Sequence, residues 1–170
     1  MSMKDFKKAE SLIEENKLLG SRMRSWGPRN QETLSRAAKI LEIVFPETYS
    51  LFLKKYGTIC AQGSEIHGLT TDDPRKLMTD DLISTVVSDR SEFGYPHHVI
   101  SLEDIGEGST YCLDLSQMND EGECPVVVWP AGGYEETPVL EIEAEDFGAF
   151  FLKQVEEQIR RINEEGAEGV

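Results

Sequence analysis

The chain has 170 residues, is 39% hydrophobic and carries a formal net charge of −15. The length suits one domain with a core of its own and is short for two. The charge is +4 over residues 1–61 (11 basic, 7 acidic) and −19 over residues 62–170 (6 basic, 25 acidic). This balance argues against nucleic acid as a direct partner, because phosphate binding needs clustered cations. A basic protein partner is compatible with it.

Membrane insertion and bound metals are not indicated. There is no apolar run approaching 18 residues and no signal peptide after Met1, so we expect a cytoplasmic protein without membrane contact. The three cysteines, Cys60, Cys112 and Cys124, are odd in number and form no CxxC pair. This spacing favours neither a disulfide framework nor a zinc site, and we expect no cofactor and no metal.

The first part of the chain has the pattern of three helices. A basic helix is predicted from Ser2 to Gly20, followed by a connector over 21–29 whose Trp26 is expected to anchor it to the core. Asn30 is a good cap for a second helix ending near Val44. A third helix should follow Pro46, with an apolar stripe and a terminating glycine: Tyr49, Phe52, Leu53, Tyr56 and Gly57.

The middle of the chain alternates between strand and helix patterns. Residues 65–69 predict a short strand, and Asp80 or Thr79 can cap a fourth helix that ends before residues 94–96. Residues 97–102 predict another strand.

The stretch from Ser91 to Leu152 contains 14 acidic residues and neither lysine nor arginine. Within it, the apolar runs 110–114 and 125–129 predict two adjacent antiparallel strands, and residues 139–142 predict one more. A final amphipathic helix begins near Phe147. Buried side chains are expected along these stripes and strands, namely Tyr49, Phe52, Leu53, Leu113, Val127, Phe147 and Phe151.

The order of elements predicts an α+β fold: a single domain with a central, mostly antiparallel sheet covered by helices. We divide the chain into an N-terminal helix and connector (1–29), the α+β domain (30–162) and a tail expected to fray (163–170).

Catalytic and metal-binding motifs are incomplete. Gly106 to Ser109 lacks the third glycine and the lysine of a phosphate-binding loop, so a tight turn is the better interpretation. A calcium loop over residues 114–123 would place Met118 where an oxygen ligand is needed. The three histidines, the cysteines and Ser101 show no spacing that identifies a nucleophile with its base. Glu103 with Asp104, or Glu135 with Glu136, could be proposed as a glycosidase pair, but neighbouring residues usually point apart.

Residues 45–57, FPETYSLFLKKYG, resemble the LPxxYxxFLxxYxG signature of the SUKH superfamily, the Smi/Knr-type domain. Residues 63–69 are similar to its next strand, 111–114 and 122–129 to its central pair of strands, and 147–152 to its final helix. The chain departs from the pattern at Phe45, which replaces leucine, at Thr58, and in its additional basic N-terminal helix.

This resemblance implies an α+β domain without catalytic residues. Its relatives are a cell-wall synthesis regulator in yeast and, in bacteria, mostly immunity proteins that bind and neutralise toxins, often nucleases. It therefore implies a bacterial antitoxin whose partner is a cognate toxin, expected to be a basic nuclease domain. The alternative is a regulatory protein-interaction module of the cell-wall-regulator type with no toxin partner.

The acidic stretch predicts where a basic partner would bind. The candidates are the acids beside its turns and one aromatic residue in a glycine-rich loop: Glu103, Asp104, Glu107, Asp120, Glu121, Tyr134, Glu135 and Glu136. Rim charges of this kind steer association with a basic surface. The same acids would also suffice merely to keep the protein soluble.

Overall fold

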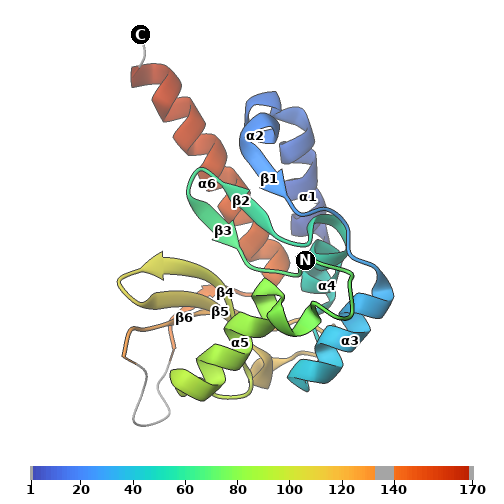
Figure 1. The fold of residues 1–170 in the computed structure, drawn as a ribbon. Coiled ribbons are helices and arrows are strands. Elements are labelled where there is room, and N and C mark those ends of the chain that lie inside the picture. The colour runs from blue at the N-terminus through green and yellow to red at the C-terminus, as the bar shows by residue number, and fades with distance from the viewer. Residues whose placement is uncertain (1, 133–139, 169–170) are drawn as a thin grey trace.

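A computed structural model describes residues 2–132 and 140–168 (Figure 1). The helices are α1 (Ser2–Glu15), α2 (Lys17–Arg22), α3 (Gln31–Leu41), α4 (Glu47–Tyr56), α5 (Asp81–Glu92) and α6 (Phe147–Glu168). The strands are β1 (Met23–Ser25), β2 (Ile59–Ala61), β3 (Ser64–Ile66), β4 (Val99–Gly106), β5 (Ser109–Asp114), β6 (Val126–Trp129) and β7 (Ile142–Ala144). The fold is α+β, as predicted.

The strands form two antiparallel sheets where the sequence predicted one. One sheet has the order β1-β2-β3 and the other β4-β5-β6-β7. The two meet just beyond β3, where the His67 amide donates to the Leu102 carbonyl at 2.7 Å. The predicted neighbours β5 and β6 do pair antiparallel, with Tyr111 opposite Val128.

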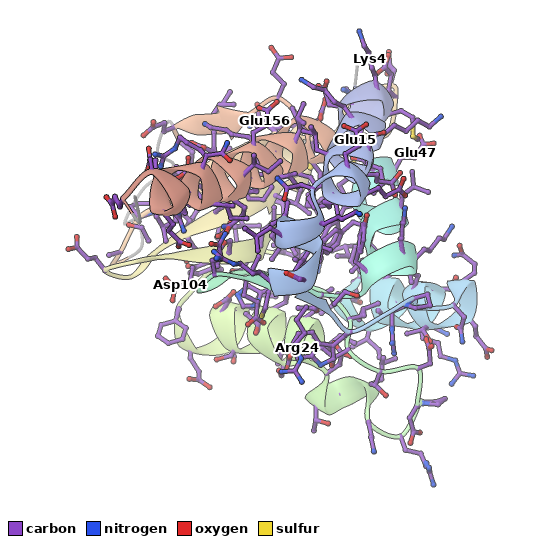
Figure 2. All side chains as sticks on the ribbon, turned by 90° about the horizontal axis from the view of Figure 1, so that it is seen from above. Lys4, Glu15, Arg24, Glu47, Asp104 and Glu156 are labelled. Carbon is purple, nitrogen blue, oxygen red and sulfur yellow. The ribbon has the colours of Figure 1, made fainter. Side chains whose placement is uncertain are left out.

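The two faces of the larger sheet are covered differently. Ile100, Leu113 and Val126 lie side by side across three strands and belong to the main core. Their alternate neighbours point to the other face, where Val99, Cys112, Val127 and Trp129 form a second, smaller cluster. Seen from above, α6 and α5 lie on opposite sides of the strands (Figure 2).

Within the main core, aromatic side chains of α4 and α6 pack against one another. Phe52 lies 5.2 Å from Phe147 and 5.6 Å from Phe151 between ring centroids. All seven side chains predicted to be buried are at most 1% exposed, which confirms the assigned helix faces and strands.

Several helix ends agree with the sequence. Asn30 caps α3 by accepting from the Thr33 amide at 2.8 Å, and Asp80 caps α5 through the Leu82 amide. Gly57 ends α4 with φ of 69°, and an added Cβ there would come within 2.5 Å of the Leu69 carbonyl oxygen. Glycine is required at this position both by the backbone angle and by the close approach.

Local predictions failed in the N-terminal region. The first helix breaks at Asn16, whose side chain caps α2 by accepting from the Leu19 amide. The connector 21–29 contains β1, and β2 was not predicted, because three-residue strands carry too little periodicity to recognise. Trp26 does not anchor the connector in the core: it is 38% exposed, and the Arg24 guanidinium lies 5.6 Å from its ring.

The ends of the chain are joined to the central domain. Phe6 of α1 belongs to the same core as residues 30–162 and lies 5.3 Å from Phe151. At Gly148 an added Cβ would lie 2.1 Å from the Ser2 carbonyl oxygen, so α1 and α6 approach closely. The segment expected to fray is helical as far as Glu168, with ion pairs from Arg160 to Glu164 and from Arg22 to Glu165 along it.

Candidate protein-binding site

The acids predicted to bind a partner lie in different places. Asp104 and Glu107 are exposed on the β4–β5 hairpin, whose turn has positive φ at Glu107 and Gly108, as a two-residue type I′ turn requires. Asp120 and Glu121 are exposed in the loop after β5. Since β5 has six residues, this loop and the hairpin turn are about 20 Å apart.

The other candidates differ from expectation or cannot be placed. Tyr134, Glu135 and Glu136 lie outside the described residues. Glu103 was predicted to be exposed beside a turn, and this is wrong: it lies within β4 and is 7% exposed. A β-bulge between Ser101 and Glu103 interrupts the alternation of side chains and turns Glu103 toward α6, opposite Tyr111.

Some acids of the stretch 91–152 stabilise the fold instead of projecting into solvent. Buried Glu123 accepts from the Thr48 amide at 2.8 Å and from its hydroxyl at 2.9 Å. Asp114 accepts from the Ser116 amide, and Asp146 accepts from the Ala149 amide in the first turn of α6. With Glu103, these are four of the 14 acids, so the exposed negative charge is smaller than the sequence suggested.

A groove of about 570 Å³ lies between the end of α5 and the β4–β5 hairpin; we call it the α5 groove. Its described lining consists of Asp89, Glu92, Phe93, Tyr95, Asp104, Gly108, Thr110, Pro130 and Gly132. Three of these residues are acidic, and no lysine or arginine is among them. The groove therefore combines negative charge with aromatic surface.

The floor of the α5 groove is well supported. The Tyr95 ring lies 5.1 Å from Trp129, and its hydroxyl is 3.3 Å from that of Thr110. Asp89 accepts a hydrogen bond from Ser101 at 2.5 Å, and burial raises the pKa of its carboxyl. Phe93, in contrast, is 64% exposed at the mouth. Aromatic residues are enriched at protein interfaces, so Phe93 is a candidate contact residue for a partner.

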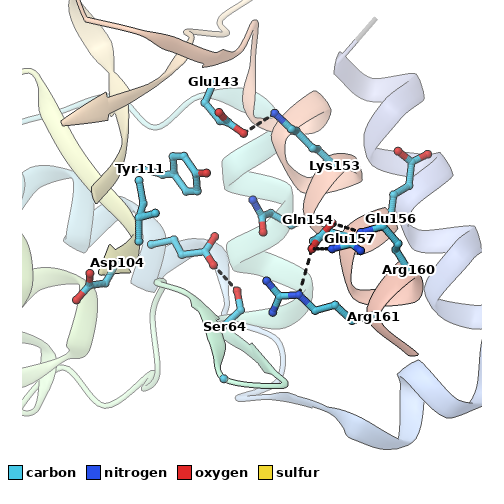
Figure 3. A pocket seen from close by; sticks show the side chains of 13 residues that line it. Ser64, Asp104, Tyr111, Glu143, Lys153, Gln154, Glu156, Glu157, Arg160 and Arg161 are labelled. Atoms are coloured by element: carbon cyan, nitrogen blue, oxygen red, sulfur yellow. Dashed lines mark hydrogen bonds and ion pairs between the residues drawn. The ribbon is translucent and has the colours of Figure 1, made fainter. Parts of the chain in front are cut away.

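A second groove, of about 610 Å³, lies between α6 and strands β3, β4, β5 and β7; we call it the α6 groove (Figure 3). Here the negative charges face cations. Lys153 pairs with Glu143 at 2.5 Å, and Glu157 pairs with both Arg160 and Arg161. These pairs lower the pKa of Glu157 to about 2. The cations follow residue 152 in the sequence, yet the fold returns them to the edge of the acidic sheet.

The geometry does not assemble a catalytic group from the residues considered above. Ser101 is buried and donates to Asp89, so its hydrogen-bond acceptor is a carboxyl group and not a histidine. Burial raises the pKa of Cys60 to about 11 and that of Cys124 to about 12, which disfavours their thiolates. Among residues 2–132 and 140–168, no group of three or more histidine, cysteine or acidic residues could hold a metal ion.

Among the described lining residues of the α5 groove, sequence reasoning predicted only Asp104. Asp89, Glu92 and Phe93 end a helix, and only the folded chain brings them to the hairpin that carries Asp104. The sequence offered one indication of this groove. The turn at Gly94 carries two aromatic residues, Phe93 and Tyr95, next to the acidic Glu92.

The fold and grooves define a class: an antiparallel α+β domain with helices on both faces and polar grooves suited to protein contacts. A family model described as SMI1-KNR4 cell-wall (SUKH_5) matches residues 9–156. The chain therefore belongs to the SUKH superfamily, as its sequence signature indicated. Proteins of this family are in general not enzymes, and the family supports a role as a protein-interaction module.

A solved structure of a protein from Pseudomonas syringae pv. tomato is similar to this chain. The two are 21% identical, with a TM-score of 0.52, and the alignment covers 75% of this chain and 87% of that one. At this level of identity the likeness supports the fold alone. No helix in the described ranges is both long and apolar enough to cross a bilayer.

Proposed function

We propose that this protein is a bacterial, cytoplasmic immunity protein that binds a cognate toxin domain and blocks it. The family supports a binding role. The α5 groove supports a basic partner in particular, because its described lining has three carboxylates and no cation. A nuclease toxin exposes a basic groove for phosphates, and an acidic surface can occupy that groove as a charge mimic. The protein needs no catalytic residue and no cofactor for this activity.

The proposed interface is the hairpin end of the larger sheet. It comprises Asp104 and Glu107, the α5 groove, and the segment with Tyr134, Glu135 and Glu136, which follows the lining residues Pro130 and Gly132 in the chain. Asp120 and Glu121, at the other end of β5, are left outside this interface. They provide a matched control because they are exposed acids of the same type.

The test is charge reversal, with binding measured against the product of the neighbouring gene as the candidate toxin. The double variant Asp104→Lys, Glu107→Lys should lower the association rate about tenfold or more at low salt and weaken its salt dependence. The reason is that charges at the rim of an interface mainly affect how fast the two proteins associate. Glu135→Lys with Glu136→Lys is the second variant. Asp120→Lys with Glu121→Lys makes the same charge change and should leave the rate within about twofold. The proposed interface would be contradicted if all three variants associated with the candidate toxin at the same rate as wild type.

The cell-wall description of the matching family favours a second candidate, a regulatory interaction module without a toxin partner. Co-purification with the product of the neighbouring gene separates the two functions. A stable complex that protects cells from that product supports immunity. Regulation is supported if no complex forms and if cells that lack this protein grow normally in the presence of the neighbouring gene product.

A further inference from the structure

A buried carboxyl group in the α6 groove has incomplete hydrogen bonding. Glu103 is 7% exposed; its Oε1 accepts from the Ser64 hydroxyl, while its Oε2 is covered and has no hydrogen-bond partner among the described residues. Buried charged groups are normally paired, since leaving one unpaired costs free energy. Burial accordingly raises the pKa of Glu103. An unpaired buried carboxyl lining a cavity indicates a binding site.

The backbone holds this carboxyl at the groove wall. The β-bulge that turns Glu103 toward α6 lies in the middle of a paired strand, so its position is fixed by the sheet. Its cross-strand neighbour Tyr111 also lines the groove and is held edge-on by Phe150 at 5.4 Å. Figure 3 shows Tyr111 on the strand side and Gln154 on α6 across from it. An acceptor and an aromatic ring thus stand side by side.

The charges that line the α6 groove favour binding of a cationic group. Five acids and three bases line it. The three bases are all held in ion pairs: Lys153 with Glu143, and Arg160 and Arg161 with Glu157. Glu156 pairs with Lys8 at 3.2 Å. In the described part of the chain, this leaves Glu103 and Asp104 as the lining carboxylates without an ion-pair partner.

We propose that the α6 groove is a subsite for one arginine side chain of the protein partner, with Glu103 as the acceptor and Tyr111 as the surface on which the guanidinium stacks. The inference rests on the proposed function for the basic character of that partner. Arginine fits better than lysine because its planar group can donate in several directions while stacking on an aromatic ring. Oε2 is covered, so access to it requires movement of neighbouring side chains; the lining includes the half-buried Gln154 and the exposed Arg161, both with long, flexible side chains.

The competing occupant is Arg161 of the same chain. Its positive charge already lowers the pKa of Glu103, although its ion pair is with Glu157. If Arg161 occupies the subsite, Arg161→Gln should strengthen binding of an added guanidinium about tenfold or more. Under our proposal, this variant binds the added guanidinium about as wild type does. The pKa of Glu103 should rise in either case, because a nearby positive charge is removed.

The experiment uses N-acetyl-arginine methylamide as the probe and NMR of the full chain as the readout. We expect saturable shifts at Ser64, Glu103 and Tyr111 with a dissociation constant of about 1–10 mM, as befits a single side chain. The pKa of the Glu103 carboxyl, followed by its ¹³C signal, should fall as the probe binds. N-acetyl-lysine methylamide should bind more weakly, and N-acetyl-glutamine methylamide should cause no saturable shift.

Two variants separate a binding role from a structural one. Glu103→Gln keeps the shape and removes the charge, and should weaken arginine binding about tenfold or more, since a charge-assisted hydrogen bond is lost. Glu156→Gln removes the same charge from the rim of the same groove and should bind the probe like wild type. Absence of saturable shifts in wild type, or equal binding by wild type and Glu103→Gln, overturns the proposal.

Failure of this proposal is distinguishable from failure of the proposed function. The probe titration contains no toxin, so its failure removes the arginine subsite and leaves the acidic interface standing. If the probe binds but no reversal at the hairpin end affects toxin association, the interface is wrong and the subsite stands.

Discussion

The two grooves on either side of the β4–β5 hairpin differ in how their acids are compensated. The α5 groove has Asp89, Glu92 and Asp104 and no cation in its described lining. The α6 groove also has an excess of acids, yet Lys153, Arg160 and Arg161 reach it from α6 and form ion pairs there. Asp104 lines both and marks the ridge between them.

This difference shows that a run of acidic residues in the sequence does not by itself predict a negatively charged surface in the folded protein. Along the chain, Ser91 to Leu152 has no cation, but α6 begins inside that run and folds its basic residues back against the sheet. Ion pairing reduces the negative potential in the α6 groove, whereas the described lining of the α5 groove contains no cation. If the partner is basic, as proposed, electrostatic steering should therefore act mainly from the α5 side.

The largest effect is expected from the core beneath α6. Phe151→Ala should lower the free energy of unfolding by about 3–5 kcal/mol, because it removes a fully buried ring. Val127→Ala, in the cluster on the opposite face, should cost roughly 1–2 kcal/mol, since two methyl groups are lost. Urea denaturation measures both, with the exposed Val44→Ala as control. If Phe151→Ala melted like wild type, the assigned face of α6 would be wrong.

The next effect concerns acids that do not belong to either groove. Glu123→Ala leaves the Thr48 amide and hydroxyl without their acceptor and should cost about 1–3 kcal/mol. Glu121→Ala, an exposed neighbour, should change stability by less than about 0.5 kcal/mol. Chemical denaturation of both variants checks the distinction; similar losses would mean that the hydrogen bonds from Thr48 to Glu123 contribute little to stability.

Glu103 should make stability depend on pH. Burial raises its pKa in the folded protein, so the folded state binds a proton more readily than the unfolded chain. The resulting stabilisation is fully present below the unfolded pKa of about 4.3 and is lost as pH rises through the folded pKa. As the pH is lowered from 7 toward the unfolded pKa, the Tm of wild type should therefore rise relative to that of Glu103→Gln. Asp89 and Glu123 titrate in both proteins, so the difference isolates Glu103; parallel curves would argue against its raised pKa.

The ion pair at the rim of the α6 groove should contribute little to stability. Lys153 and Glu143 form it with the lysine side chain 57% exposed, and such pairs contribute about 0–1 kcal/mol. A double-mutant cycle with Lys153→Met and Glu143→Gln measures the coupling, which should decrease further in 1 M salt. A coupling above about 2 kcal/mol would show that this groove is held closed by charge.

Metal chelation and reduction should have no effect. Neither EDTA nor dithiothreitol should change the Tm or the binding of a partner, since the described acids, histidines and cysteines form no metal-binding group and Cys112 and Cys124 are buried. A Tm that rises with calcium or zinc, or falls with reductant, would contradict this expectation.

The sequence by itself determined most of the helices, the main strands of the larger sheet and the core, but not the break between α1 and α2 at Asn16. Stripes such as Tyr49, Phe52 and Leu53 repeat at helical spacing, and capping residues such as Asn30 and Asp80 act on amides two or three positions away. These interactions are local, so the sequence carries them without knowledge of the fold. The same holds for the hairpin turn at Glu107 and Gly108.

Tertiary structure alone decided which acids share a surface. The bulge at Glu103 reverses the direction expected from strict alternation, and the return of α6 places cations beside acids that are distant in the sequence. The antiparallel order likewise sends Asp104 and Asp120 to opposite ends of β5. Each outcome depends on how strands pair and helices pack, and neither charge composition nor periodicity specifies those contacts.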